Sequence, residues 1–154
     1  MSWLSERDLM RCIKLNADDA TLRAFQGIYS MDKLPNAVKQ YPCLIIINTQ
    51  SHNLPGEHWI AAFIGKNRQG EIFDSLALSP ANSLIRWMNT YARTYRRNHL
   101  QYQHPLSSRC GAYVLYYVLK RLQNPKCVIN KFTPSLYENE QRVLDFYRLL
   151  RKNK

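Results

Sequence analysis

The chain has 154 residues, of which 45% are apolar and 21% are charged. This length suits one domain with a buried core, and this composition excludes a disordered chain. The apolar runs are no longer than a strand, so we expect no membrane-spanning segment. The net charge of +11 favours an anionic partner, DNA first, although a basic surface that serves only solubility also fits it. We expect a single domain over residues 1–154.

The N-terminal part predicts two helices. Residues 5–16 place acids in a first turn and apolar side chains on one face, which is typical of an amphipathic helix and not of a signal peptide. Residues 16–25 predict a second, short helix capped at Asp18 or Asp19. Residues 26–35 favour a loop.

The middle of the chain predicts strands. Residues 43–49 are apolar and β-branched, as in a buried strand. Residues 58–64 and 71–75 flank a polar segment bracketed by Gly65 and Gly70, which predicts a hairpin.

The C-terminal part predicts a helix over 81–97, a short strand over 99–103, a buried helix over 110–122 and a last helix that begins near Pro134. Strands in the middle with helices at both ends indicate an α+β domain with a central, mostly antiparallel sheet.

Cys110 is the first candidate for chemistry, because it opens the apolar helix. The free N–H groups and the dipole at a helix N-terminus favour a nucleophilic thiolate. A buried structural cysteine is the alternative, and we adopt it for the other three cysteines, Cys12, Cys43 and Cys127. The cysteines and histidines match no zinc spacing, so we predict no metal site, and without a secretion signal we expect free thiols in a reducing compartment.

His58 and Asp74 lie at matching ends of the predicted hairpin. Antiparallel pairing puts the start of one strand beside the end of the next, so Asp74 can orient His58 as a base for Cys110. An ordinary half-buried histidine and a turn aspartate are the alternatives. Trp59 is expected in the core on the opposite face from His58, with a position over the site as the alternative.

A glutamine before Cys110 is a candidate oxyanion donor, together with the Cys110 backbone N–H. Gln103 and Gln101 lie two residues apart on one face of the predicted strand, and the residues alone do not separate them.

Several stretches together resemble the adenovirus protease (adenain) family and, more loosely, the SUMO-protease clan. They are "FQGIYSMDKLP", "CLIIINT", "PGEHWIAAFI", "GEIFDS", "QHPLSSRCGAYVLYY" and "EQRVLDFYRLLRK". The His-Trp pair and the Gln-x6-Cys-Gly spacing are the specific features. The match is closest to the adenain-like proteases of polinton (Maverick) elements and adenovirus-like viruses.

The resemblance implies an adenain/SUMO-protease-like fold with Cys110 as nucleophile, His58 as base, Asp74 as orienting group and Gln103 as oxyanion donor. It also implies cleavage of capsid precursors during virion maturation, in the host nucleus and the virion, with no cofactor required and with DNA and a short viral peptide as activators. The residue at 74 is Asp, where adenovirus enzymes usually have Glu, and the chain is shorter. The segment before Gln103 lacks the cysteine that captures the peptide, so we do not expect capture through a disulfide.

Arg86, Arg93 and Arg97 recur at helical spacing and predict a basic helix face that binds DNA phosphates without sequence preference. Charge that only complements helix ends is the alternative. Two other functions remain open. One is a protease that removes ubiquitin or a ubiquitin-like protein, and the other is a non-enzymatic, basic DNA-associated virion module.

Overall fold

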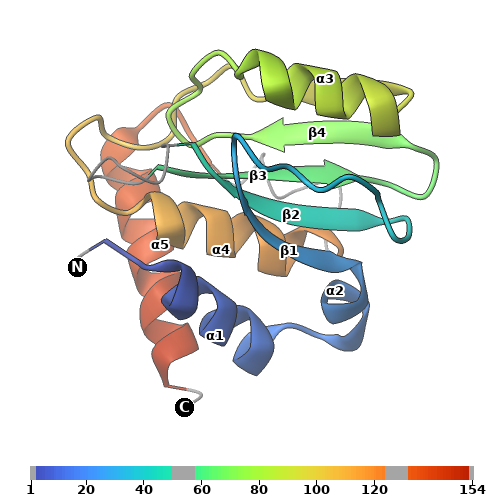
Figure 1. The fold of residues 1–154 in the computed structure, drawn as a ribbon. Coiled ribbons are helices and arrows are strands. Elements are labelled where there is room, and N and C mark those ends of the chain that lie inside the picture. Colours follow the sequence, from blue (N-terminus) through green and yellow to red (C-terminus); the bar gives the residue numbers. More distant parts are fainter. Residues whose placement is uncertain (1–2, 50–57, 124–131, 153–154) are drawn as a thin grey trace.

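The computed structural model describes residues 3–49, 58–123 and 132–152. Five strands form one sheet in chain order: β1 (Phe25–Ser30), β2 (Cys43–Asn48), β3 (Trp59–Ile64), β4 (Gln69–Phe73) and β5 (Thr94–Arg97). The helices are α1 (Glu6–Asn16), α2 (Asp19–Ala24), α3 (Asn82–Tyr91), α4 (Cys110–Arg121) and α5 (Leu136–Arg151). Helix α3 covers one face of the sheet, and α1, α4 and α5 lie on the other (Figure 1).

The predicted α+β class is confirmed, but the sheet is more mixed than expected. Strands β2, β3 and β4 pair antiparallel, whereas the two edge strands β1 and β5 run parallel to their neighbours. Parallel pairing requires a connection that returns the chain to the same end of the sheet. Residues 31–42 provide one return and helix α3 provides the other.

Three predicted elements differ in the structure. The helix predicted over 81–97 ends at Tyr91, and its last four residues form β5. Pairing with β4 outweighs the helical pattern there, and Gly70 leaves room for the close approach, since a Cβ at that position would meet the side chains of Met88, Ala92 and Tyr95 within 3.2 Å. Residues 99–103 form no strand, and the loop predicted over 26–35 contains β1.

Polar side chains cap the starts of α1, α2 and α5. Ser5 and Asp8 form a capping box on α1, Asp18 rather than Asp19 caps α2, and the Ser135 hydroxyl accepts from the Glu138 N–H on α5. Each cap supplies a partner to a backbone N–H that the helix leaves unpaired.

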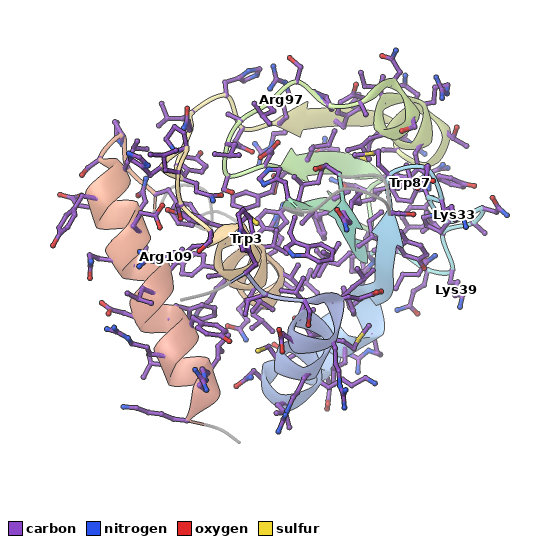
Figure 2. All side chains as sticks on the ribbon, turned by 60° about the vertical axis from the view of Figure 1, so that its left-hand side comes forward. Trp3, Lys33, Lys39, Trp87, Arg97 and Arg109 are labelled. Carbon is purple, nitrogen blue, oxygen red and sulfur yellow. The ribbon has the colours of Figure 1, made fainter. Side chains whose placement is uncertain are left out.

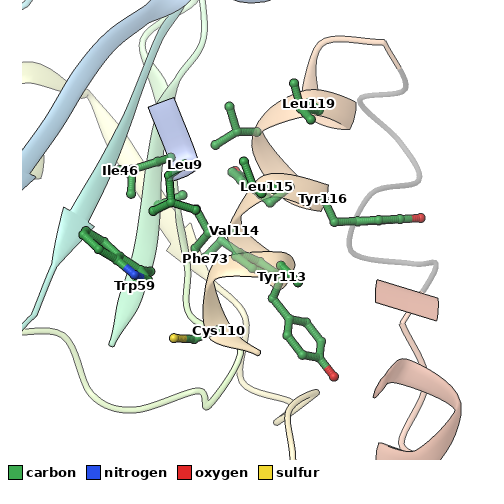
Figure 3. Close-up of a cluster of buried hydrophobic side chains, with 14 of the residues drawn as sticks. Leu9, Ile46, Trp59, Phe73, Cys110, Tyr113, Val114, Leu115, Tyr116 and Leu119 are labelled. Carbon is green, nitrogen blue, oxygen red and sulfur yellow. The ribbon is translucent and has the colours of Figure 1, made fainter. Parts of the chain in front are cut away.

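The sheet separates two hydrophobic clusters. The larger one lies between the sheet and α4, and Figure 3 shows Leu9 of α1, Ile46 of β2 and Val114 of α4 within it. The smaller one lies between the sheet and α3. Helix α4 is buried from Cys110 to Leu119, which confirms the predicted central helix and holds its first residue rigidly against the sheet. Within the described residues, no helix is long and apolar enough to cross a membrane.

Candidate active site

The candidate site lies at one end of the central strands, where β3 starts, β4 ends and α4 begins (Figure 1). His58 immediately precedes β3, Asp74 immediately follows β4, and Cys110 is the first residue of α4. Since β3 and β4 are antiparallel, the start of one lies beside the end of the other. The topology therefore brings together the three residues that the sequence singled out.

His58 and Asp74 form a short, buried hydrogen bond. His58 Nε2 lies 2.6 Å from Asp74 Oδ1, and the two residues are only 9% and 7% exposed. The Asp74 carboxylate thereby holds Nε2 and leaves Nδ1 as the ring nitrogen that can face the thiol. This is the pairing that the hairpin predicted.

The environment of His58 favours its protonated form. Burial lowers the pKa of His58, but hydrogen bonds and charge interactions with Asp74 and Cys110 raise it more, to about 9. The imidazole also interacts directly with the Cys110 thiol. A histidine that is protonated at neutral pH beside a thiol stabilises the thiolate, which is the reactive form.

Cys110 lies at an N-terminus that no side chain caps. Arg109 is the N-cap residue of α4, and its side chain makes no capping hydrogen bond. The first N–H groups of α4 and the positive end of its dipole therefore lie at the thiol. Cys110 is fully buried in this structure.

Trp59 is packed into the same hydrophobic cluster as Cys110 (Figure 3). Its indole Nε1–H donates to the Leu4 carbonyl over 2.9 Å, and Leu4 packs against Gly111. The predicted core position of Trp59 is confirmed. The alternative, a position over the site, stays a prediction.

The structure separates the two glutamines that the sequence left tied. Gln103 is almost fully buried, and its Nε2 donates to the Ser107 carbonyl over 2.9 Å, in the loop that leads to Cys110. Its Oε1 accepts from the Ser75 hydroxyl over 2.6 Å. Gln101 instead donates to the backbone carbonyl of Gln103. The side-chain nitrogen of Gln103 is therefore held in the loop that leads to Cys110, and its role as an oxyanion donor stays a prediction.

Three residues that support the site had no assigned role in the sequence: Ser75, Asn98 and Glu140. Glu140 on α5 is 8% exposed and accepts hydrogen bonds from the His104 N–H, the Ser107 hydroxyl and the Arg109 guanidinium. It thus holds the loop before Cys110. The sequence offered one signal for the role of Glu140, its position on the inward face of an amphipathic helix. Its partners could not be predicted, because they lie more than thirty positions away.

A hollow of about 500 Å³ opens beside this loop. Leu106 and Tyr137 line it and are 90% and 75% exposed, while Arg109 and Glu140 contribute charged groups. A large apolar side chain at such a hollow offers a surface to a bound chain.

The predicted basic helix face is wrong. Arg86 lies on α3, Arg93 follows the helix, and Arg97 ends β5, because α3 stops at Tyr91. The Arg97 guanidinium lies 3.5 Å from the carbonyls of Ala77 and Leu78. Figure 2 shows Arg97 at the β5 edge of the sheet, well separated in that view from Lys33 and Lys39.

Within the described residues, no three His, Cys, Asp or Glu side chains converge into a group that could hold a metal ion. The prediction for Cys127, and the residues just before His58 in the stretch "PGEHWIAAFI", fall outside the described residues.

The chain is similar to known proteins both in sequence and in fold. No protein-family model matches the chain. Cysteine protease S273R of African swine fever virus (isolate Tick/Malawi) is 32% identical over 91 residues, covering 51% of this chain and 33% of the relative. SUMO-1 cysteine protease S273R of the Warthog/Namibia isolate is 31% identical over the same length and shares. The match thus spans about a third of these relatives.

Solved structures show the same fold. The pS273R protease of African swine fever virus aligns with a TM-score of 0.53 and 22% identity, covering 80% of this chain and 59% of that one. ChlaDub1 from Chlamydia trachomatis aligns with a TM-score of 0.55 and 14% identity, covering 99% of this chain and 81% of that one.

The fold is shared with these solved structures, and the thiol, imidazole and carboxylate have the order that a thiol nucleophile with a base and an orienting group requires. In sequence, the chain is similar to S273R-type, SUMO-protease-like cysteine proteases. The more specific resemblance to adenain stays a prediction.

Proposed function

We propose that this chain is a cysteine endopeptidase with Cys110 as its nucleophile. The observation that carries the proposal is His58, which pairs with the buried Asp74 carboxylate over 2.6 Å and interacts with the Cys110 thiol at a helix N-terminus. A binding module needs no such arrangement, and this argues against the non-enzymatic DNA-associated alternative.

In this mechanism the Cys110 thiolate attacks the scissile carbonyl carbon and forms a C–S bond. The Gln103 amide and backbone N–H groups at the start of α4 stabilise the oxyanion. When the C–N bond breaks, His58 gives its proton to the departing amine. A water molecule, deprotonated by His58, then hydrolyses the thioester and regenerates the thiol. Asp74 holds the imidazole in one orientation throughout and stays ionised.

We propose capsid precursors, cut during maturation in the host nucleus and the virion, as substrates. The support is the adenain resemblance and the similarity to viral proteases over half of the chain. The hollow lined by Leu106 and Tyr137 supports a polypeptide substrate, since it lies beside the loop before Cys110 and offers exposed apolar side chains to a bound chain. DNA and a short viral peptide are the activators that we propose on the same resemblance.

Removal of a ubiquitin-like protein is the second candidate function. Relatives that match this chain carry the name SUMO-1 cysteine protease, and the fold is shared with ChlaDub1. The catalytic steps are the same for both candidates, so only the substrates separate them.

The test of the nucleophile uses a cysteine-reactive peptide aldehyde or vinyl sulfone, with peptide mapping of the labelled residue. Cys110→Ala should abolish cleavage and labelling. Cys43→Ala is the matched control, because Cys43 is also buried but its desolvation raises the pKa to about 11 and leaves it unreactive. Turnover by the Cys110→Ala protein would end the proposal. Parallel assays with capsid precursors and with ubiquitin-like fusions, read by mass spectrometry, would separate the two substrate classes.

A further inference from the structure

The side chain of Asn98 continues the sheet where its backbone pairing stops. Strand β4 pairs with β5 as far as Ile72 and Arg97. Beyond this point the Asn98 amide pairs with the backbone of Asp74. Asn98 Oδ1 accepts from the Asp74 N–H over 2.9 Å, and Asn98 Nδ2 donates to the Asp74 carbonyl over 2.7 Å. A primary amide has both the donor and the acceptor that this requires.

The amide is buried and fully used. Asn98 is 6% exposed, and its Nδ2 also donates to the Leu100 carbonyl over 3.1 Å. Loss of a buried partner leaves the remaining polar groups unpaired, which is costly in a protein interior. The backbone of Asp74 is therefore held from one side by a single side chain.

A fixed backbone at Asp74 fixes the direction of its carboxylate. Asp74 Oδ1 receives both His58 Nε2 and, over 2.9 Å, the Leu76 N–H. Each of these contacts depends on where the Asp74 Cα–Cβ bond points, because the side chain has only two rotatable bonds. A shift of the backbone would lengthen the 2.6 Å contact with His58.

We propose that Asn98 is a positioning residue for Asp74 and, through Asp74, for His58. The importance of this role for catalysis rests on the proposed function. Asn98 touches neither the thiol nor a substrate. It sets the orientation of the base by holding the group that orients it.

Asn139 provides a matched control within the same chain. It is fully buried, its Oδ1 accepts from the Thr133 N–H over 2.8 Å, and its Nδ2 donates to the Thr133 carbonyl over 2.6 Å. The same amide therefore makes the same two-point contact with a backbone at the start of the α5 region. Like Asn98, it also donates to a third carbonyl, that of Tyr102 over 3.1 Å, so its contacts are with Thr133 and Tyr102 and not with Asp74. Any effect that comes only from losing a buried amide should occur in both variants.

The experiment compares Asn98→Leu with Asn139→Leu, which remove the hydrogen bonds and nearly keep the volume. The readout is the titration of the His58 ring, followed by NMR on histidine-labelled protein and assigned with His58→Gln. The titratable groups that act on His58 are Asp74 and Cys110, so Cys110→Ala serves as the background in which only Asp74 contributes. This readout does not depend on cleavage of any substrate.

Asn98→Leu should move the His58 titration toward its ordinary value by roughly one pH unit, as expected when an ion-pair partner is loosened. Asn139→Leu should leave the His58 titration unchanged, even if it lowers the thermal midpoint as much as Asn98→Leu does. An unchanged His58 titration in Asn98→Leu would overturn the proposal. If that variant does not fold, Asn98→Ala, which removes both hydrogen bonds without adding a larger apolar group, should shift the titration in the same direction, and no shift would overturn the proposal. If the unmodified chain does not cleave peptides but Asn98→Leu shifts the His58 titration as expected, the proposed function is rejected and the positioning role of Asn98 still holds.

Discussion

The Ser75 hydroxyl donates a 2.6 Å hydrogen bond to Oε1 of Gln103. The backbone carbonyl of Ser75 also accepts from the N–H groups of Tyr102 and Gln103. Ser75 follows Asp74 directly, so two consecutive residues orient the two sides of the site. Asp74 holds the base, and Ser75 holds the side-chain amide that we propose as oxyanion donor.

Ser75→Ala should lower kcat for peptide cleavage by roughly tenfold, up to the hundredfold that is typical of losing an oxyanion donor. Without the hydroxyl, the Gln103 amide is held only by the Ser107 carbonyl, so it turns more easily and presents its oxygen, which would repel the developing negative charge. Steady-state kinetics with a fluorogenic peptide would measure this. Ser83→Ala is the control, because the Ser83 hydroxyl also donates to a carbonyl, that of Met31, but outside the site. A normal kcat for Ser75→Ala would contradict the role.

The two glutamines should differ in kinetics as they differ in contacts. Gln103→Ala should reduce kcat by roughly a hundredfold or more, since it removes the donor itself. Gln101→Ala should have a much smaller effect, because its amide supports the backbone of Gln103 and does not point toward the Cys110 loop. The reverse ranking would show that the oxyanion donor is Gln101.

The pKa of His58 predicts how stability depends on pH. Its value in the folded chain, about 9, lies above the ordinary 6.5, so folding favours the protonated ring. The resulting stabilisation is complete below pH 6.5 and is lost as the pH rises through about 9. The thermal midpoint should fall over this range, and His58→Gln should remove that part of the fall. Parallel melting curves at several pH values would measure it, and identical pH profiles for the two proteins would refute the assignment.

Glu71 should be the most sensitive charged position for stability. It is 2% exposed and receives hydrogen bonds from Tyr117, Arg121 and Arg96. Burial raises the pKa of Glu71, but these partners lower it more, so the net shift is downward. Glu71→Ala should lower the free energy of unfolding by about 3–5 kcal/mol, as when one partner of a buried ion pair is removed.

The control for this loss is Arg96→Ala. The Arg96 side chain is 72% exposed, and an exposed ion-pair partner contributes no more than about 1 kcal/mol. Urea unfolding at neutral pH would compare the two variants. Equal losses would show that burial does not set the strength of this network.

The proposed contact with DNA predicts a steep dependence on salt. If basic side chains bind phosphates, log affinity should fall by about 0.9 per contact for each tenfold rise in salt, whatever the DNA sequence. Arg86, Arg93 and Arg97 do not share a helix face, so replacing them together with glutamine should change this slope only as much as removing the same charge elsewhere, and should leave peptide cleavage intact.

Fluorescence anisotropy with a short duplex across a salt series would measure the slope. Replacement of the three exposed arginines Arg142, Arg148 and Arg151 removes the same charge from α5 and serves as the control. We expect equal effects of both sets, as from a diffuse field of the net charge, and a much larger effect of the first set would contradict this. Undetectable binding at low salt would show that DNA is not a partner.

By itself, the sequence determined the parts of this protein that depend on neighbouring residues. The caps at Ser5, Asp18 and Ser135, the buried helix from Cys110 and the β3–β4 hairpin all follow from local patterns. The hairpin alone predicted that His58 would meet Asp74, because antiparallel pairing fixes which residues face each other.

Only the tertiary structure decided what depends on distant partners. It ended the helix predicted over 81–97 at Tyr91 because β4 offers a backbone ladder to residues 94–97, and pairing of this kind has no signature in the local sequence. It paired the side chain of Gln103, and not that of Gln101, with a hydroxyl 28 positions away, and it paired the Asn98 side chain with the backbone of Asp74 across 24 positions. Side-chain hydrogen bonds have no period along the chain, so their partners emerge only when packing brings the segments together.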